Sequence, residues 1–169
     1  MTLGQVNMAV QVIANLAVVA SVVFLAVQAR FGIRMLKDAA ECNHMDKHQS
    51  VSRMMSKNPQ LAELWVRGSK QGIAPLNDAE RAQFVNFYTY VLRIWEELFL
   101  QNRRGVIDDV IWTSNVRILS DTQAMLGAQD AWTVRRHRFT PSFQDFYDEM
   151  EATTQARPLY DLTSAPVVQ

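Results

Sequence analysis

The first 29 residues of the chain contain no Asp, Glu, Lys or Arg, and this uncharged opening limits what the chain can fold into more than any other feature. As an α-helix, residues 6–29 are roughly 36 Å long, at about 1.5 Å per residue. The hydrocarbon core of a bilayer is about 30 Å thick and is crossed by about 20 mostly apolar residues. The sequence therefore predicts a single transmembrane helix, with residues 1–29 as the anchor.

The charges that follow this stretch predict its orientation. Arg30, Arg34 and Lys37 come directly after it, whereas the residues before it include no Lys or Arg. Basic residues favour the cytoplasmic side of a membrane and contact anionic headgroups there. We expect a single-pass inner-membrane protein with its N-terminus outside and its C-terminal domain in the cytoplasm.

A cleaved signal peptide is the competing interpretation of the same stretch. Val27 and Ala29 are small enough to precede a cleavage point. However, the stretch lacks a basic n-region and is longer than the usual apolar region of a leader. The anchor is therefore the favoured interpretation.

The predicted anchor is not uniformly apolar, because its polar side chains fall on one face. At 100° per residue they occupy an arc of roughly 140°. Either the outermost two lie at the headgroups, or the whole face contacts a transmembrane helix of another subunit or of a second copy, since polar side chains join helices in lipid. These residues are Asn7, Gln11, Asn15, Ser21 and Gln28.

Composition excludes several classes of protein. The chain has 169 residues, 17 basic and 17 acidic, so its net charge is zero and no overall electrostatic attraction to nucleic acid is expected. Its one cysteine, Cys42, rules out an internal disulfide and a multi-cysteine metal site. About 125 residues remain outside the anchor and the tail, enough for one compact core.

Beyond the anchor, the sequence is typical of an all-α protein, in which a juxtamembrane helical stalk leads into a compact helical bundle. No segment alternates apolar and polar residues as a strand does. We expect the stalk over residues 30–57, the bundle over 58–153, and a mobile tail over 154–169, where periodicity is lost.

Helix boundaries inside the bundle are marked by capping residues. Asn58-Pro59 predicts one helix start, and Asn77 with Glu80 has the spacing of a capping box. The strongest apolar periodicity follows, from Phe84 to Phe99, and Gly105 should end that helix.

Two more helices and a final one are expected after it. Asp108 can cap a helix that reaches Leu126, with Gly127 just beyond it. A further helix is expected to include Ala131, Trp132 and Phe139, and Thr140-Pro141 begins the last.

One group in the stalk has the residue types of a metal site. Glu41, His44 and His48 lie at i, i+3 and i+7, on one side of a helix, and a pair of histidines four residues apart can chelate a divalent metal. Di-iron bundles need a second Glu-x-x-His, which the sequence lacks. Solvated histidines are the simpler interpretation. Cys42 is expected to be a surface or structural thiol because its nearest histidine lies on a different side of the helix.

Charged residues in the bundle are expected mainly to form ion pairs that stabilise the fold. Glu96 and Glu97 interrupt the most apolar helix, and one of them is expected to be partly buried and paired with Arg103, Arg104 or the run 135–138. That run can instead face solvent or meet anionic lipid through Arg135, Arg136 and Arg138.

Residues 55–147 also carry marks of a known type of protein. The chain resembles a widespread group of uncharacterised bacterial proteins in which an N-terminal anchor precedes a small helical cytoplasmic domain. The resemblance implies this architecture and no activity. It does not extend to Arg103-Arg104 or to the polar face of the anchor, which are not assumed for the group. The shared marks are Asn58-Pro59, Leu61-Ala62-Glu63-Leu64-Trp65, Gly68, Leu76, Glu80, Phe84, Trp95-Glu96, Gly105, Ile107-Asp108, Trp112, Trp132, Arg138-Phe139 and Phe143.

These observations favour a membrane-anchored, non-catalytic interaction or accessory protein. It would be a subunit of a larger membrane complex or a homo-oligomer. No catalytic residue and no cofactor site is predicted. The alternative is a membrane-tethered, metal-dependent enzyme or sensor built on Glu41, His44 and His48.

Overall fold

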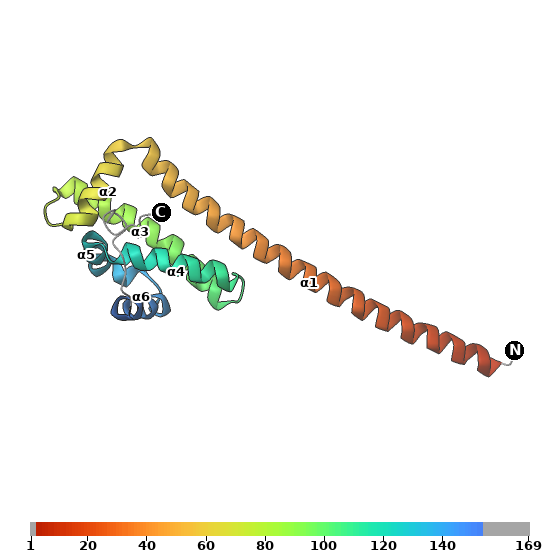
Figure 1. Ribbon diagram of the computed structural model, residues 1–169. Helices are drawn as coiled ribbons and strands as arrows, with labels where there is room; N and C mark the ends of the chain where they lie inside the picture. Colours follow the sequence, from red (N-terminus) through yellow and green to blue (C-terminus); the bar gives the residue numbers. More distant parts are fainter. Residues whose placement is uncertain (1–2, 154–169) are drawn as a thin grey trace, which may run out of the picture. The chain divides into compact units, whose positions relative to one another are not determined.

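The computed structural model describes residues 3–153, and within this range the chain is helical and contains no strand (Figure 1). The predicted all-α class is confirmed for the described residues. The elements in chain order are α1 (Leu3–Lys57), α2 (Pro59–Gln71), α3 (Asp78–Arg103), α4 (Asp109–Gln123), α5 (Leu126–Arg135), the short 3-10 helix η1 (Arg136–Arg138) and α6 (Pro141–Thr153).

The chain divides into two units, Met1–Ala39 and Ala40–Gln169, and the boundary lies inside α1. The sequence predicted a separate stalk over residues 30–57, but residues 40–57 belong to the same unit as the bundle. The reason is a face of α1 that was too thinly apolar to be recognised, on which Ala40, Val51 and Met55 pack against the core. The predicted tail, residues 154–169, lies outside the described residues.

The first unit consists of one apolar helix whose side chains are exposed. Every residue from 3 to 36 whose side chain is described is exposed, including Leu25 at 62% and Phe24 at 62%. An 18-residue window of this helix has a mean hydropathy of 2.4, and none of it is buried. By length and composition it can cross a membrane, and a signal sequence would meet the same criteria.

Helix starts in the second unit lie where the capping residues predicted them. The side chain of Asn58 accepts a hydrogen bond from the Leu61 amide at 3.1 Å, with Pro59 at the first helical position. Asn77 and Glu80 form both hydrogen bonds of a capping box at the start of α3. Asp108 caps α4 by accepting from the Val110 amide at 2.9 Å.

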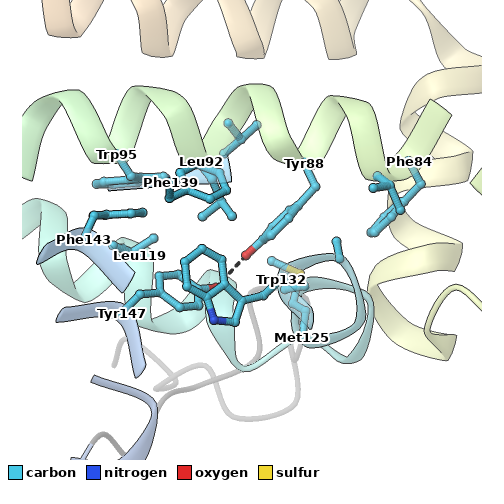
Figure 2. Packing of buried hydrophobic residues seen from close by; sticks show 14 of the residues in the cluster. Phe84, Tyr88, Leu92, Trp95, Leu119, Met125, Trp132, Phe139, Phe143 and Tyr147 are labelled. Carbon is cyan, nitrogen blue, oxygen red and sulfur yellow. Dashed lines mark hydrogen bonds between the residues drawn. The ribbon is translucent and has the colours of Figure 1, made fainter. Parts of the chain in front are cut away.

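Helix α3 is the central element of the second unit, as its periodicity predicts, and it ends before Gly105, which has a positive φ of 68°. It contacts α2, α4, α5 and α6. Its buried face carries aromatic and aliphatic side chains that meet those of the later helices, and the hydroxyls of Tyr88 and Tyr147 lie 2.8 Å apart in the core (Figure 2). Leu92 is fully buried beside them.

The expected helix ending at Leu126 is shorter than predicted. Helix α4 ends at Gln123, and Gly127 lies inside α5 rather than beyond α4. Gly127 is needed there because α5 crosses α2 closely: a Cβ on it would lie 2.3 Å from the carbonyl oxygen of Gly68. Similarly, α5 ends before Phe139, which is extended, although a helix was predicted to include it.

Glu96 is the buried carboxylate of α3, as was expected of one member of its pair. Its side chain accepts from Arg93 at 2.5 Å and from the Thr140 amide at 2.6 Å. The expected arginine partners were wrong, because the helical turn places Arg93 on the same face while the Thr140 amide comes from the start of α6. The carboxylate thus joins α3 to the N-terminus of α6.

Candidate functional site

The candidate site lies where residues 40–57 of α1 face α3 and α4. Ala40, His44, His48, Val51 and Met55 recur on one side of the helix and are buried or half-buried. The backbone of this part of α1 does not approach α3 or α4 as closely as α2 approaches α5. Side chains therefore span the distance between the helices, and space remains among them.

His44 is held in one orientation by α4. It is 7% exposed, and its Nε2 lies 3.1 Å from Oδ1 of Asn115. The Asn115 side-chain amide donates to the Ile111 carbonyl at 2.8 Å, so its oxygen is the atom that faces the histidine. His44 therefore donates from Nε2, and its tautomer is determined by this contact.

His48 lies one turn further along, between His44 and Trp95. Its ring centroid is 4.5 Å from that of His44 and 4.9 Å from that of Trp95, both edge-on. Its Nε2 atom is buried and has no hydrogen-bond partner among the described residues. Such an atom costs about 1–3 kcal/mol relative to a paired one.

Burial keeps both imidazoles neutral. Desolvation, and to a smaller extent the neighbouring His44, lower the pKa of His48 to about 4. Desolvation also lowers the pKa of His44 from its ordinary value, opposed by the hydrogen bond to Asn115 and by the charge of Glu97. At neutral pH each ring therefore has one donor and one acceptor nitrogen.

Polar contacts at the edge of the site hold α1 on α3. Lys47 forms an ion pair with Glu97, and the Asn43 amide donates to the same carboxylate at 3.2 Å. Further along, the hydroxyls of Ser50 and Tyr90 lie 3.0 Å apart. Glu97 was expected to pair, if at all, with arginines of the bundle. Its partner instead comes from the segment predicted to be a stalk.

Two cavities adjoin at His48 and Ile118, which line both. The first has a volume of about 390 Å³ and is mostly apolar, with Trp65, Trp95 and Phe87 among its walls. The second, of about 410 Å³, lies between α1 and α4. The residues lining the first are His48, Val51, Ser52, Met55, Ser56, Trp65, Phe87, Val91, Trp95, Ile118, Thr122 and Met125, and those lining the second are Glu41, His44, Met45, His48, Val110, Ile111, Ser114, Asn115 and Ile118.

The three residues of the predicted metal group lie at one cavity but are not arranged as metal ligands. Glu41, His44 and His48 all line the second cavity. Within residues 3–153, however, no three His, Cys, Asp or Glu side chains form a group that can hold a metal ion. Nε2 of His44 is already engaged by Asn115. The expectation that these histidines are solvated is wrong for His44, which is buried, while His48 is half-buried.

Cys42 is an exposed free thiol, as its position on the helix predicted. It points away from the face that carries His44 and His48, since a step of two residues turns a helix by about 200°. It takes no part in the site.

The predicted interaction face of α1 lies in the first unit. Asn7, Gln11, Asn15, Ser21 and Gln28 are all exposed. Ser21 differs from the amides, because its hydroxyl donates to the Ala17 carbonyl at 2.7 Å within the helix. Its hydrogen-bonding need is met locally, so the four amide side chains are what distinguishes this face.

The predicted lipid-surface residues differ in solvent exposure and in whether they form ion pairs. Arg30 and Arg34 are exposed, and Lys37 is half-buried. In the run 135–138, Arg136 is paired with Asp148 at 2.6 Å and also bonds Gln144. Arg135 is half-buried, whereas the Arg138 side chain is exposed. The run thus has a structural role through Arg136.

Comparison of the chain with protein-family models, with curated proteins and with solved structures gives no match.

Sequence reasoning missed the residues that complete the His48 site. Trp95, Asn115 and Ile118 come from two other helices, and no local spacing relates them to α1. The available signal was the recurrence of Ala40, His44 and His48 at intervals of four, which marks one helix face. That signal indicates burial but does not identify the partner helices.

Proposed function

We propose that the chain is a non-catalytic accessory protein, anchored in the inner membrane by α1 and joined through it to another transmembrane helix. The observation that carries this proposal is the exposure of every described side chain between residues 3 and 36, most of them apolar. Soluble monomers rarely expose so continuous an apolar surface. A bilayer is the environment in which that surface is stable.

The polar face supports docking on a second helix. Amide side chains that face hydrocarbon leave donors and acceptors unpaired, and polar side chains of a neighbouring helix satisfy them. Gln11 and Asn15 lie well inside the apolar stretch, where headgroups do not reach, and both are exposed. The partner is a helix of another membrane subunit or of a second copy.

The orientation follows from the flanking charges. Arg30, Arg34 and Lys37 follow the span and favour the cytoplasmic side, which places residues 40–153 in the cytoplasm. The uncharacterised bacterial proteins that the chain resembles have the same arrangement, an N-terminal anchor before a small helical cytoplasmic domain. The second unit would then contact cytoplasmic parts of the same assembly.

Photo-crosslinking of the full chain in native membranes tests the docking. A diazirine amino acid at Asn15 should give one discrete protein adduct. The same label at Leu16, on the opposite face at the same depth, should react mainly with lipid. The double variant Gln11→Leu, Asn15→Leu, with the label placed at Gln28, should lose the adduct, whereas the control Ile13→Leu, Leu16→Ile should keep it.

Two outcomes contradict the proposal at different points. Release of the full-length chain from membranes by alkaline carbonate would contradict the membrane anchor. A mature chain shorter by about 29 residues would contradict it as well. Equal protein labelling from Asn15 and Leu16 would contradict the docking face but would be consistent with the anchor.

A further inference from the structure

The two cavities that adjoin at His48 are lined only by residues of the second unit. We propose that they bind a neutral, lipophilic small molecule bearing a carbonyl or hydroxyl oxygen, with His48 as its hydrogen-bond partner. The two cavities are about 390 and 410 Å³, in the range of small-molecule sites.

The unpaired nitrogen gives the cavities a hydrogen-bonding capacity that no described side chain meets. Buried side-chain nitrogens nearly always have a partner, and each exception needs an explanation. Among the described atoms in this state, Nε2 of His48 belongs to a residue that lines both cavities. His44 does not supply the missing partner, because no hydrogen bond joins the two rings and its Nε2 is engaged by Asn115.

The charges around the cavities argue against an ionic ligand at His48: the first cavity is lined by no charged side chain, and the second has only the carboxylate of Glu41. Neither cavity is lined by Lys or Arg, so a carboxylate or phosphate would find no cation. Burial lowers the pKa of His48 to about 4, so its ring is also uncharged at neutral pH. A neutral imidazole can donate to a carbonyl or accept from a hydroxyl.

The walls of the first cavity determine the shape of the ligand. Trp65 and Phe87 lie edge-to-face at 5.3 Å, and Trp95 adjoins His48. Flat aromatic walls favour a planar apolar body. Ser52, Ser56 and Thr122 are the other polar side chains that line this cavity.

Benzophenone is a suitable probe because it is neutral, aromatic and carries one carbonyl. Light also inserts it into nearby C–H bonds, so bound probe marks its site. Diphenylmethane has the same two rings without the oxygen and serves as the matched ligand. The full chain is used in nanodiscs, with the free concentration of each compound measured.

We expect benzophenone to bind about five- to tenfold more tightly than diphenylmethane, the ratio for one hydrogen bond of about 1 kcal/mol. Photolabelling should mark Met55 and Met125, in the first cavity, above any site in residues 3–39. His48→Leu should abolish the preference for benzophenone, and the exposed His137→Leu should leave it unchanged.

Ile118→Trp provides a test that does not depend on burial of the altered residue. Ile118 lines both cavities yet is 49% exposed, so a larger ring fits without disturbing the core. This variant should reduce labelling of Met55 and Met125 at least fivefold. Equal affinities for the two compounds, or undiminished labelling in Ile118→Trp, would overturn the proposal. Neither result bears on docking of the span.

Discussion

The two units of this protein are both helical, but their side chains meet opposite surroundings. Leu25 in the first unit is 62% exposed, whereas Leu92 in the second is fully buried. Helix formation alone therefore does not distinguish them. The second unit buries its apolar side chains on its own, while the first leaves them for an external partner, which we propose to be lipid and another helix. Substitutions of one residue type in both units sharpen this comparison.

Glycine substitution should give the largest difference. Gly127→Val places a side chain against the carbonyl of Gly68, where even a Cβ would lie 2.3 Å from the carbonyl oxygen. Because that oxygen belongs to the backbone of α2, relieving the clash requires a shift of the helix. We expect the second unit to lose more than about 3 kcal/mol of unfolding free energy. Denaturation of the full chain in micelles, followed by tryptophan fluorescence, measures this, because all four tryptophans lie beyond residue 40.

Gly32→Val is the matched control for that experiment. A Cβ at Gly32 meets nothing within 4 Å. The unfolding free energy of the second unit should stay within about 0.5 kcal/mol. Similar losses for both variants would show that the close approach of α2 and α5 is not what the substitution disrupts.

Truncation of leucine should give the next largest effect. Leu92→Ala leaves a cavity in the core and should cost about 3 kcal/mol, whereas Leu25→Ala removes a side chain that the protein itself does not bury. The same fluorescence measurement should show little change for Leu25→Ala. A comparable loss from Leu25→Ala would mean that the first unit packs onto the second and would break the comparison.

Stability of the second unit should also fall in acid because of His48. Its pKa is about 4 in the folded state and about 6.5 in the unfolded chain, so the unfolded state binds more protons between these values. The stabilisation is present above about pH 6.5 and is lost as the pH falls towards 4, by on the order of 3 kcal/mol. Urea titrations of the full chain at several pH values measure the loss.

The variant His48→Phe tests whether this pH dependence of stability comes from His48. His48→Phe should flatten the stability profile between pH 6.5 and 4, although His44, whose pKa is lowered by the same burial, retains part of the slope. His137→Phe, at an exposed position, should leave the profile unchanged. An unaltered slope in His48→Phe would place the acid sensitivity elsewhere.

Removal of one helix cap should give the smallest effect. Asn77→Ala deletes the side-chain oxygen that accepts from the Glu80 amide at 2.9 Å, and should cost about 1 kcal/mol. Asn77→Asp keeps that acceptor and should cost much less. If both variants lose the same amount, the cap contributes through the backbone conformation of residue 77 rather than through its side chain.

The parts of the fold that the sequence predicted are those encoded within a few residues. Asn58, Asn77 and Asp108 cap helices through hydrogen bonds to amides two or three positions away, so their roles are visible as spacing. The α4–α5 boundary was not visible in this way. Gly127 resembles a helix end in the sequence but is required inside a helix by the distant Gly68.

The same distinction applies to the candidate site. The side of α1 that bears His44 and His48 is a matter of helical period, and the sequence placed Glu41 with them. Burial was mispredicted because the apolar residues of that face are few. The contacts with Trp95 and Asn115 lie 47 and 71 positions along the chain from their histidines, so only the packing of helices could supply them.

By itself, the sequence determined that the chain is helical, where most helices begin, and that the first helix is apolar enough to cross a membrane. These properties depend on hydrogen bonds within single turns and on the transfer of side chains between solvents. The tertiary structure alone decided that residues 40–57 join the bundle, that His44 is buried and His48 half-buried, and that two cavities adjoin at His48. Those features depend on contacts between helices that are distant in the sequence, and a local pattern of residues does not predict such contacts.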